Sequence, residues 1–138
     1  MLALKHRLAG SVCGLLLAGL ASAIPDAAQS IGLMPMEKSG HSASDRKGFY
    51  LNVLNEGKRS IIVDVEVMPG PDGTRPKAVK VQPNRLKIGP ESVRKIILVI
   101  GNLENEKQRE VNVCVSTQKH NSNTLLRICG AYTAHKRR

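Results

Sequence analysis

Residues 111–130 read VNVCVSTQKHNSNTLLRICG, two alternating apolar runs on either side of a polar centre, each with one cysteine. Alternation with a period of two is typical of β-strands that bury one face. In the first run the valines share a face, so Cys114 lies on the opposite, more polar face. In the second run Ile128 and Tyr132 share a face, and Cys129 lies opposite to them. The stretch therefore predicts a β-hairpin with both cysteines on its outer face.

One register of this hairpin pairs the cysteines with each other and the core-facing residues with each other. The pairs in this register are Cys114–Cys129, Val115–Ile128 and Val111–Tyr132. The turn then falls on residues 120–123, whose Asn, Ser and His side chains suit turns. Directly opposite residues have Cα separations of about 4.5–5.5 Å, which a disulfide can bridge. We predict a structural disulfide here, because the Cys-x-x-Cys spacing of a redox pair is missing from the sequence.

The remaining sequence reads as short strands separated by turn residues. The predicted strands are 31–36, 47–55, 60–68, 78–88, 92–100, 109–117 and 124–133. Pro35 lies inside the first of these, which favours an edge position. Because β-branched residues dominate and no helical periodicity is sustained, the sequence predicts an all-β, seven-stranded, immunoglobulin-like antiparallel β-sandwich. A small closed barrel is the alternative.

The first 23 residues are predicted to be a secretory signal peptide. Lys5 and Arg7 precede a short apolar run, and Ala21-Ser22-Ala23 form a small-x-small cleavage site. The apolar stretch from 8 to 23 is shorter than the roughly 20 residues of a membrane-spanning helix. We therefore expect residues 24–138 to form a single exported domain without a membrane span. Export also favours a disulfide over two free thiols.

Composition narrows the classes of function. The chain has 21 Lys and Arg against 11 Asp and Glu, a formal net charge of +10, and removing Lys5 and Arg7 leaves +8. Such charge invites a nucleic-acid interpretation, but one Phe, two Tyr and no Trp leave few rings for base stacking. Attraction to acidic envelope surfaces suits an exported chain better, and the basic tail 135–138 reads as a solvated terminus. We expect no nucleic-acid partner.

The histidines offer no catalytic or metal-binding pattern. They fall in the signal peptide, in predicted loops or in the tail, without a nucleophile–base pairing or zinc-type spacing. The carboxylates lie in turns or on one solvated strand face. The sequence therefore predicts a protein that is not an enzyme and has no catalytic residue, metal or cofactor.

The order of the segments resembles the N-terminal immunoglobulin-like domain of periplasmic pilus (fimbrial) chaperones of chaperone–usher systems. The matching features are a strand ending in Asn55-Glu56-Gly57, Pro83 followed by Leu86, Ile88 and a glycine-proline turn, Glu104-Asn105-Glu106 before a strand that begins with Arg, and Asn123-Thr124-Leu125 opening the last strand. The resemblance covers roughly residues 31 to 134. It implies a periplasmic chaperone-like protein that assists the folding and assembly of pilus subunits.

The resemblance also implies how a partner is bound. Members of that family lend the last strand of this domain to an incomplete pilin subunit, which is β-strand addition. They hold the subunit's C-terminal carboxylate with an arginine and a lysine; here Lys38 lies next to the arginine position, and Ala134 takes the lysine position. The expected partner-binding residues are Leu125, Arg127, Ala131 and Lys38. The expected partner is a pilin-like or other envelope protein subunit that meets an edge strand.

A second class of function fits the same residues. A structural or adhesive immunoglobulin-like envelope protein needs no chaperone activity and no carboxylate anchor. The sequence leaves both hypotheses open.

Overall fold

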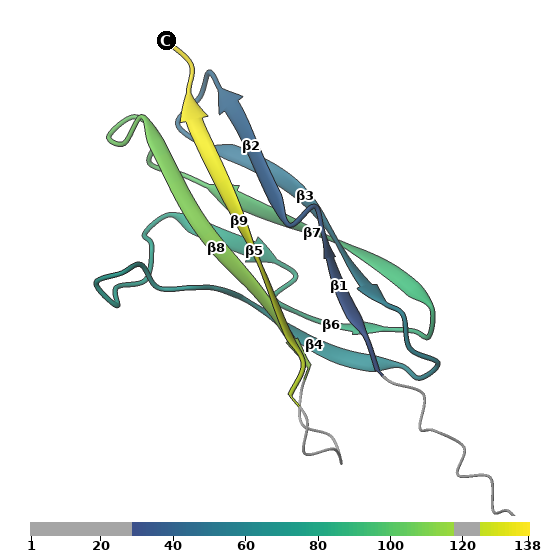
Figure 1. Cartoon of the computed structure of the whole chain (residues 1–138). Helices are drawn as coiled ribbons and strands as arrows, with labels where there is room; N and C mark the ends of the chain where they lie inside the picture. Colours follow the sequence, from purple (N-terminus) through teal and green to yellow (C-terminus); the bar gives the residue numbers. More distant parts are fainter. Residues whose placement is uncertain (1–28, 118–124) are drawn as a thin grey trace, which may run out of the picture.

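Two β-sheets pack face to face in this computed structural model, which describes residues 29–117 and 125–138 (Figure 1). The strands are β1 (Ile31–Met34), β2 (Glu37–Ser42), β3 (Lys47–Asn55), β4 (Ile61–Val67), β5 (Val79–Gln82), β6 (Arg85–Ile88), β7 (Ser92–Ile100), β8 (Gln108–Thr117) and β9 (Arg127–Lys136). One sheet has the order β1-β3-β7-β5 and the other β2-β9-β8-β4-β6. The predicted all-β sandwich is confirmed. The predicted signal peptide and the turn at 120–123 lie outside the described residues.

The predicted number of seven strands is wrong, because two of the crossings from one sheet to the other occur at prolines inside predicted strands, where the sequence analysis expected no crossing. Residues 78–88 are not one strand: β5 pairs with β7 in one sheet, whereas β6 pairs with β4 in the other. Pro83 lies between them, and a proline has no N–H with which to continue a ladder. Pro35 lies in the same way between β1, which pairs with β3, and β2, which pairs with β9.

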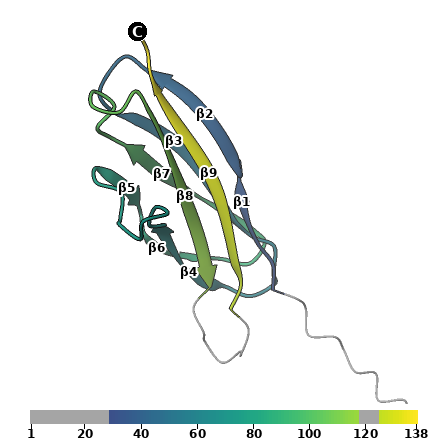
Figure 2. The same ribbon diagram turned by 60° about the vertical axis from the view of Figure 1, so that its left-hand side comes forward.

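The strand β2 was missed by the sequence analysis, because its residues EKSGHS are polar and do not alternate. It pairs with β9 in parallel, so the expectation of a purely antiparallel sandwich also needs correction. The edge position expected from Pro35 is confirmed, since β1 and β2 are each the outermost strand of a sheet. Figure 2 shows β2 beside the C-terminal part of β9.

The core lies between the sheets and is built from alternate residues of each strand. Phe49, Leu51 and Val53 of β3 are buried, and so are Val113 and Val115 of β8. The fully buried aromatic residues are Phe49 and Tyr132, whose ring centroids lie 6.2 Å apart. The period-two pattern in the sequence thus becomes a period-two pattern of burial.

The predicted hairpin register is confirmed. β8 and β9 pair Cys114 with Cys129, Val115 with Ile128 and Val111 with Tyr132. The cysteines are joined by a disulfide with a Cα–Cα separation of 4.0 Å. The two cysteine residues differ in exposure: Cys129 is exposed, but Cys114 is only 3% exposed, because it lies on a central strand between Glu66 of β4 and Cys129 of β9.

A buried asparagine ties one end of the sandwich together. Asn55, 2% exposed, donates from its Nδ2 atom to the carbonyl oxygens of Arg59 (2.7 Å), Gly89 (2.8 Å) and Ile88 (3.3 Å). Its Oδ1 atom accepts from the Gly57 N–H at 3.0 Å. One side chain therefore connects the β3–β4 turn with the β6–β7 turn, and both its amide nitrogen and its oxygen are hydrogen-bonded.

Candidate functional site

The last strand has a partner on both sides over only part of its length. β2 pairs with β9 from Ala131 to Lys136, while β8 pairs with it from Arg127 to His135. In the part of the chain that the structure describes, no strand pairs with residues 127–130 on the β2 side (Figures 1 and 2). We call residues 125–130 the open segment. The resemblance implied that the last strand is available to a client; within the described residues, β9 lacks a partner on that side only along this segment.

The backbone groups of the open segment have defined directions. The carbonyl oxygen of Leu126 accepts from the Thr117 N–H at 2.9 Å, so Leu126 faces β8, whereas the Ala131 N–H donates to the Met36 carbonyl at 2.8 Å on the other side. Because backbone groups alternate between the two sides of a strand, the N–H and C=O groups of Arg127 and Cys129 point to the open side. An unpaired row of this kind is a template for another strand.

The C-terminal end of the open segment is set by the crossing from β1 to β2. Tyr132 on β9 donates its hydroxyl to the Pro35 carbonyl at 2.7 Å. The crossing passes so close to β9 that a Cβ on Gly130 would lie 2.6 Å from the Met36 carbonyl oxygen and would also clash with the Tyr132 hydroxyl. Gly130 therefore has to be a glycine for β2 to reach β9 at Ala131.

Replacing Tyr132 by phenylalanine should change how stability depends on pH. Burial raises the pKa of Tyr132 to about 12, from an ordinary value of 10.0. The unfolded chain loses this proton near pH 10, so the tyrosine's contribution is complete below pH 10 and falls by up to about 3 kcal/mol as the pH rises to 12. Urea unfolding at several pH values should show a shallower alkaline loss for Tyr132→Phe, with a cost of about 1 kcal/mol at neutral pH from the lost hydrogen bond. An identical alkaline slope in both proteins would contradict this.

The strand β2 is held on β9 by contacts near the chain's C-terminal end. His41 and His135 stack with ring centroids 4.9 Å apart, and the His135 Nε2 atom lies 2.9 Å from the Ser39 hydroxyl. The Arg137 N–H donates to the Ser42 carbonyl at 2.7 Å. These contacts hold β2 along residues 131–136 of β9, and β2 does not pair with the open segment.

The four expected partner-binding residues fall into two pairs. Leu125, 51% exposed, and Arg127 lie on the open segment, and the Arg127 Nη2 atom is 2.8 Å from the Met68 sulfur. Ala131 and Lys38 lie just beyond it: Ala131 pairs with Glu37, and Lys38 pairs with Tyr132. The structure thus brings Ala131 and Lys38 together on neighbouring strands, and places Leu125 and Arg127 farther along the same edge.

The sequence analysis missed Met36, which is 48% exposed where the β1–β2 crossing meets β9. The available signal was the Met-Pro-Met sequence at 34–36, in which two apolar residues flank a proline that interrupts pairing. Together with Leu125, it places apolar side chains at both ends of the open segment.

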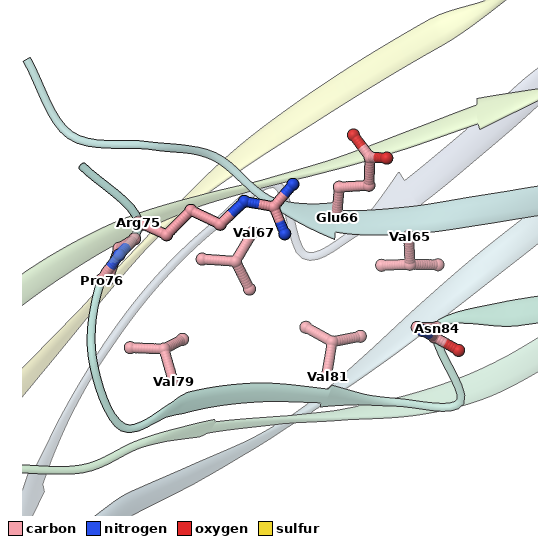
Figure 3. Close-up of a pocket in the computed structure, with 8 residues that line it drawn as sticks. All are labelled: Val65, Glu66, Val67, Arg75, Pro76, Val79, Val81 and Asn84. Carbon is pink, nitrogen blue, oxygen red and sulfur yellow. The ribbon is translucent and has the colours of Figure 1, made fainter. Parts of the chain in front are cut away.

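A separate pocket lies between β4 of one sheet and β5 of the other (Figure 3). Its volume is about 310 Å³. Figure 3 shows Val67, Val79 and Val81 pointing into the space, with Arg75 and Glu66 at its rim. Such a pocket can receive a small apolar group, but its residues form no nucleophile–base pair.

Two further observations concern residues 29–117 and 125–138. None of these residues forms a group of three or more His, Cys, Asp or Glu that could hold a metal ion. Within the same residues no helix is long and apolar enough to cross a membrane.

No protein-family model and no curated protein matches the sequence, but solved structures share the fold. The chaperone DraB of E. coli is 17% identical, with a TM-score of 0.62 over 78% of this chain and 55% of its own. The complex of the chaperone CsuC with the tip adhesion subunit CsuE, from the archaic chaperone–usher Csu pili of Acinetobacter baumannii, gives 16% identity and a TM-score of 0.62 over 78% of this chain and 57% of that one. A PapD-like domain of human CEP192 gives 8% identity and a TM-score of 0.64 over 99% and 96%.

These likenesses show the fold and confirm its predicted class: this is an immunoglobulin-like sandwich of the kind found in pilus chaperones and in PapD-like domains. The chain spans about half the length of the chaperones, 55% of DraB and 54% of a chain in the Salmonella enterica SafA–SafB pilin–chaperone complex.

Proposed function

We propose that this protein is a non-enzymatic, periplasmic, chaperone-like binding module that assists the folding and assembly of a pilin-like or other envelope subunit. The subunit would add an extended strand to the open segment of β9. The observation that carries the proposal is the row of outward backbone groups at Arg127 and Cys129, on a strand that the disulfide fixes to β8. β-strand addition gains affinity from such main-chain groups and specificity from the flanking side chains.

The side chains around the open segment support an apolar client strand. Leu125 and Met36 are exposed there, and both would be buried by a strand laid along the segment. Arg127 and Lys38 add positive charge beside it, which suits a client that ends in a carboxylate. Cys129 is bridged to Cys114, so it contributes its backbone groups and not a free thiol.

A proline at position 127 should separate strand addition from other modes of binding. The Arg127 N–H points away from β8, so Arg127→Pro removes a hydrogen-bond donor of the open edge and leaves the β8–β9 ladder intact. Arg127→Ala is the matched control, because it removes the same side chain and keeps the N–H. Each full chain is co-expressed with pilin-like subunits of its source organism, one at a time, and the captured subunit is quantified after purification from the periplasm.

We expect Arg127→Pro to reduce capture at least tenfold, consistent with the loss of a main-chain hydrogen bond and a disturbed edge, whereas Arg127→Ala stays within a fewfold of the unmodified chain. Equal capture by the proline and alanine variants would contradict strand addition. If the unmodified chain captures none of the subunits, the proposed function fails as a whole.

The fold by itself does not select the chaperone function, because a PapD-like domain of human CEP192 shares it over 99% of this chain and 96% of its own. A structural or adhesive envelope protein would use the same sandwich without a chaperone cycle. Deleting the gene distinguishes the two functions. If the protein is a chaperone, its subunits should be degraded in the deletion strain. If it is an adhesive protein, the subunits should stay intact and adhesion should weaken.

A further inference from the structure

The outward face of the four-stranded sheet has an unusual composition. The pairing registers place its residues in four rows across β5, β7, β3 and β1. The rows are Lys80–Val99–Gly48, Gln82–Ile97–Tyr50, Lys95–Asn52–Met34 and Val93–Leu54–Gly32. We call these residues the lysine–apolar face. A sheet face toward water is normally polar, so this one needs an explanation.

Large apolar side chains on this face are open to solvent. Tyr50 is 63% exposed, Val93 55%, Met34 53% and Ile97 40%. Leu54 and Val99 are half-buried between them. The structure has six exposed large apolar side chains among its described residues, and four of them are gathered here. A contiguous exposed apolar patch is typical of a surface that meets a protein or a membrane.

The charge on the lysine–apolar face is of one sign. Lys80 and Lys95 are its only residues with a charge at neutral pH, and no row contains a carboxylate. The Lys95 ammonium lies 5.4 Å from the centroid of the Tyr50 ring, so its charge is held over the apolar patch.

The outward face of the other sheet has mixed charge. Carboxylates of Asp64, Glu66 and Glu110 are found there, and the Arg85 guanidinium lies 3.7 Å from the Asp64 carboxylate. The one-sign face is therefore a property of the four-stranded sheet and does not follow from the basic composition alone.

We propose that the lysine–apolar face binds peripherally to an anionic lipid bilayer. Tyrosine and lysine are the side chains that favour the headgroup region, where an aromatic ring lies at the interface and an ammonium on an apolar stem reaches the phosphates. Peripheral binding of this kind combines burial of apolar area with attraction between cations and anionic lipids. Tyr50 and Ile97 supply the apolar centre, and Lys80 and Lys95 supply the charge.

A second copy of the chain fits the face less well. Packed through the same face, it would bring only further lysines against Lys80 and Lys95, with no carboxylate to pair with them. The lipid surface is complementary in both respects, since it offers phosphates and an apolar layer. The inference goes beyond the proposed function, because the open segment belongs to the other sheet and stays free for a client.

The test is sedimentation of residues 24–138, which include all described residues, with vesicles of phosphatidylcholine containing about a third phosphatidylglycerol. Two matched pairs of variants are compared. Tyr50→Thr/Ile97→Thr removes apolar area from the face, and Leu125→Thr removes it elsewhere. Asn52→Asp places a carboxylate beside Lys95, and Asn112→Asp makes the same change of charge on the other sheet. Circular dichroism verifies the fold of each variant.

We expect binding to the anionic vesicles, little binding to pure phosphatidylcholine, and an at least tenfold weaker affinity for Tyr50→Thr/Ile97→Thr and for Asn52→Asp. Leu125→Thr and Asn112→Asp should stay within about threefold, since added charge off the face acts only through long-range attraction. Equal losses for the two Asp variants would show adsorption by net charge and overturn the proposal. So would the absence of vesicle binding, or a dimer that Tyr50→Thr/Ile97→Thr dissociates, which would assign the face to a second copy.

Discussion

Replacement of Asn55 by aspartate is expected to lower the free energy of unfolding by about 4 kcal/mol, although the two side chains have nearly the same shape. The Asn55 amide nitrogen donates to three carbonyl oxygens, and the side chain is 2% exposed. A carboxylate there would still accept from the Gly57 N–H, but it would carry no N–H of its own and would place a charged oxygen against three carbonyl oxygens in a buried position. Urea denaturation at neutral pH measures the loss.

The matched control for this prediction is Asn52→Asp, three residues earlier on the same strand. Asn52 lies on the outward face opposite Lys95, so the same change of charge there should alter the free energy of unfolding by no more than about 0.5 kcal/mol. Acidification should reduce the difference in the free energy of unfolding between Asn55→Asp and the unmodified chain, because a protonated carboxyl can donate one hydrogen bond. Comparable losses at the two positions would mean that Asn55 does not connect the two turns as described.

The parts of the fold that the sequence predicts well are those fixed by several constraints at once. The bounds of β3 and β7 agree with the predicted 47–55 and 92–100, because turn residues end both apolar runs. The β8–β9 register was predictable because the disulfide, the core face and the turn allowed the same pairing. A shift of one residue would have moved every apolar side chain to the wrong face.

The sheet changes at Pro35 and Pro83 could not be predicted, since a proline in an apolar run has more than one outcome. It ends a ladder, but nothing local says whether the chain then turns, bulges or crosses to the other sheet. β2 lacks an apolar pattern, and its parallel pairing with β9 joins residues 94 positions apart in sequence, Glu37 and Ala131 among them. The sequence could therefore suggest that the last strand meets a client. It could not show that β2 pairs with residues 131–136, so that only the open segment lacks a partner on that side.

The sequence contains a partial indication of the lysine–apolar face. Residues 96–100 of β7 are apolar without alternation, a pattern typical of a strand covered on both faces. The structure covers one face with the second sheet and, within the described residues, lays no further strand over the other. Only the registers show that Tyr50 and Lys95 join Ile97 on that uncovered side.

Removal of the disulfide is expected to have the second largest effect. The bond joins residues 15 apart, and closing a loop of that size contributes about 3 kcal/mol on the chain-entropy model. Cys114→Ala/Cys129→Ala should lose about this much in urea denaturation. Dithiothreitol should bring the unmodified chain to nearly the same stability and leave the double variant unchanged.

The same variant should also weaken the capture of a subunit by more than its stability explains. Cys129 belongs to the open segment, and the disulfide is the covalent link that fixes its backbone to β8. Without the disulfide the open segment can fray at the start of β9. Binding of a client strand then also has to overcome the conformational entropy of ordering this segment. Capture measured where the double variant is fully folded should therefore fall severalfold. Unchanged capture would show that β8–β9 pairing alone orders the edge, and unchanged stability after verified reduction would rule out a stabilising role for the bond.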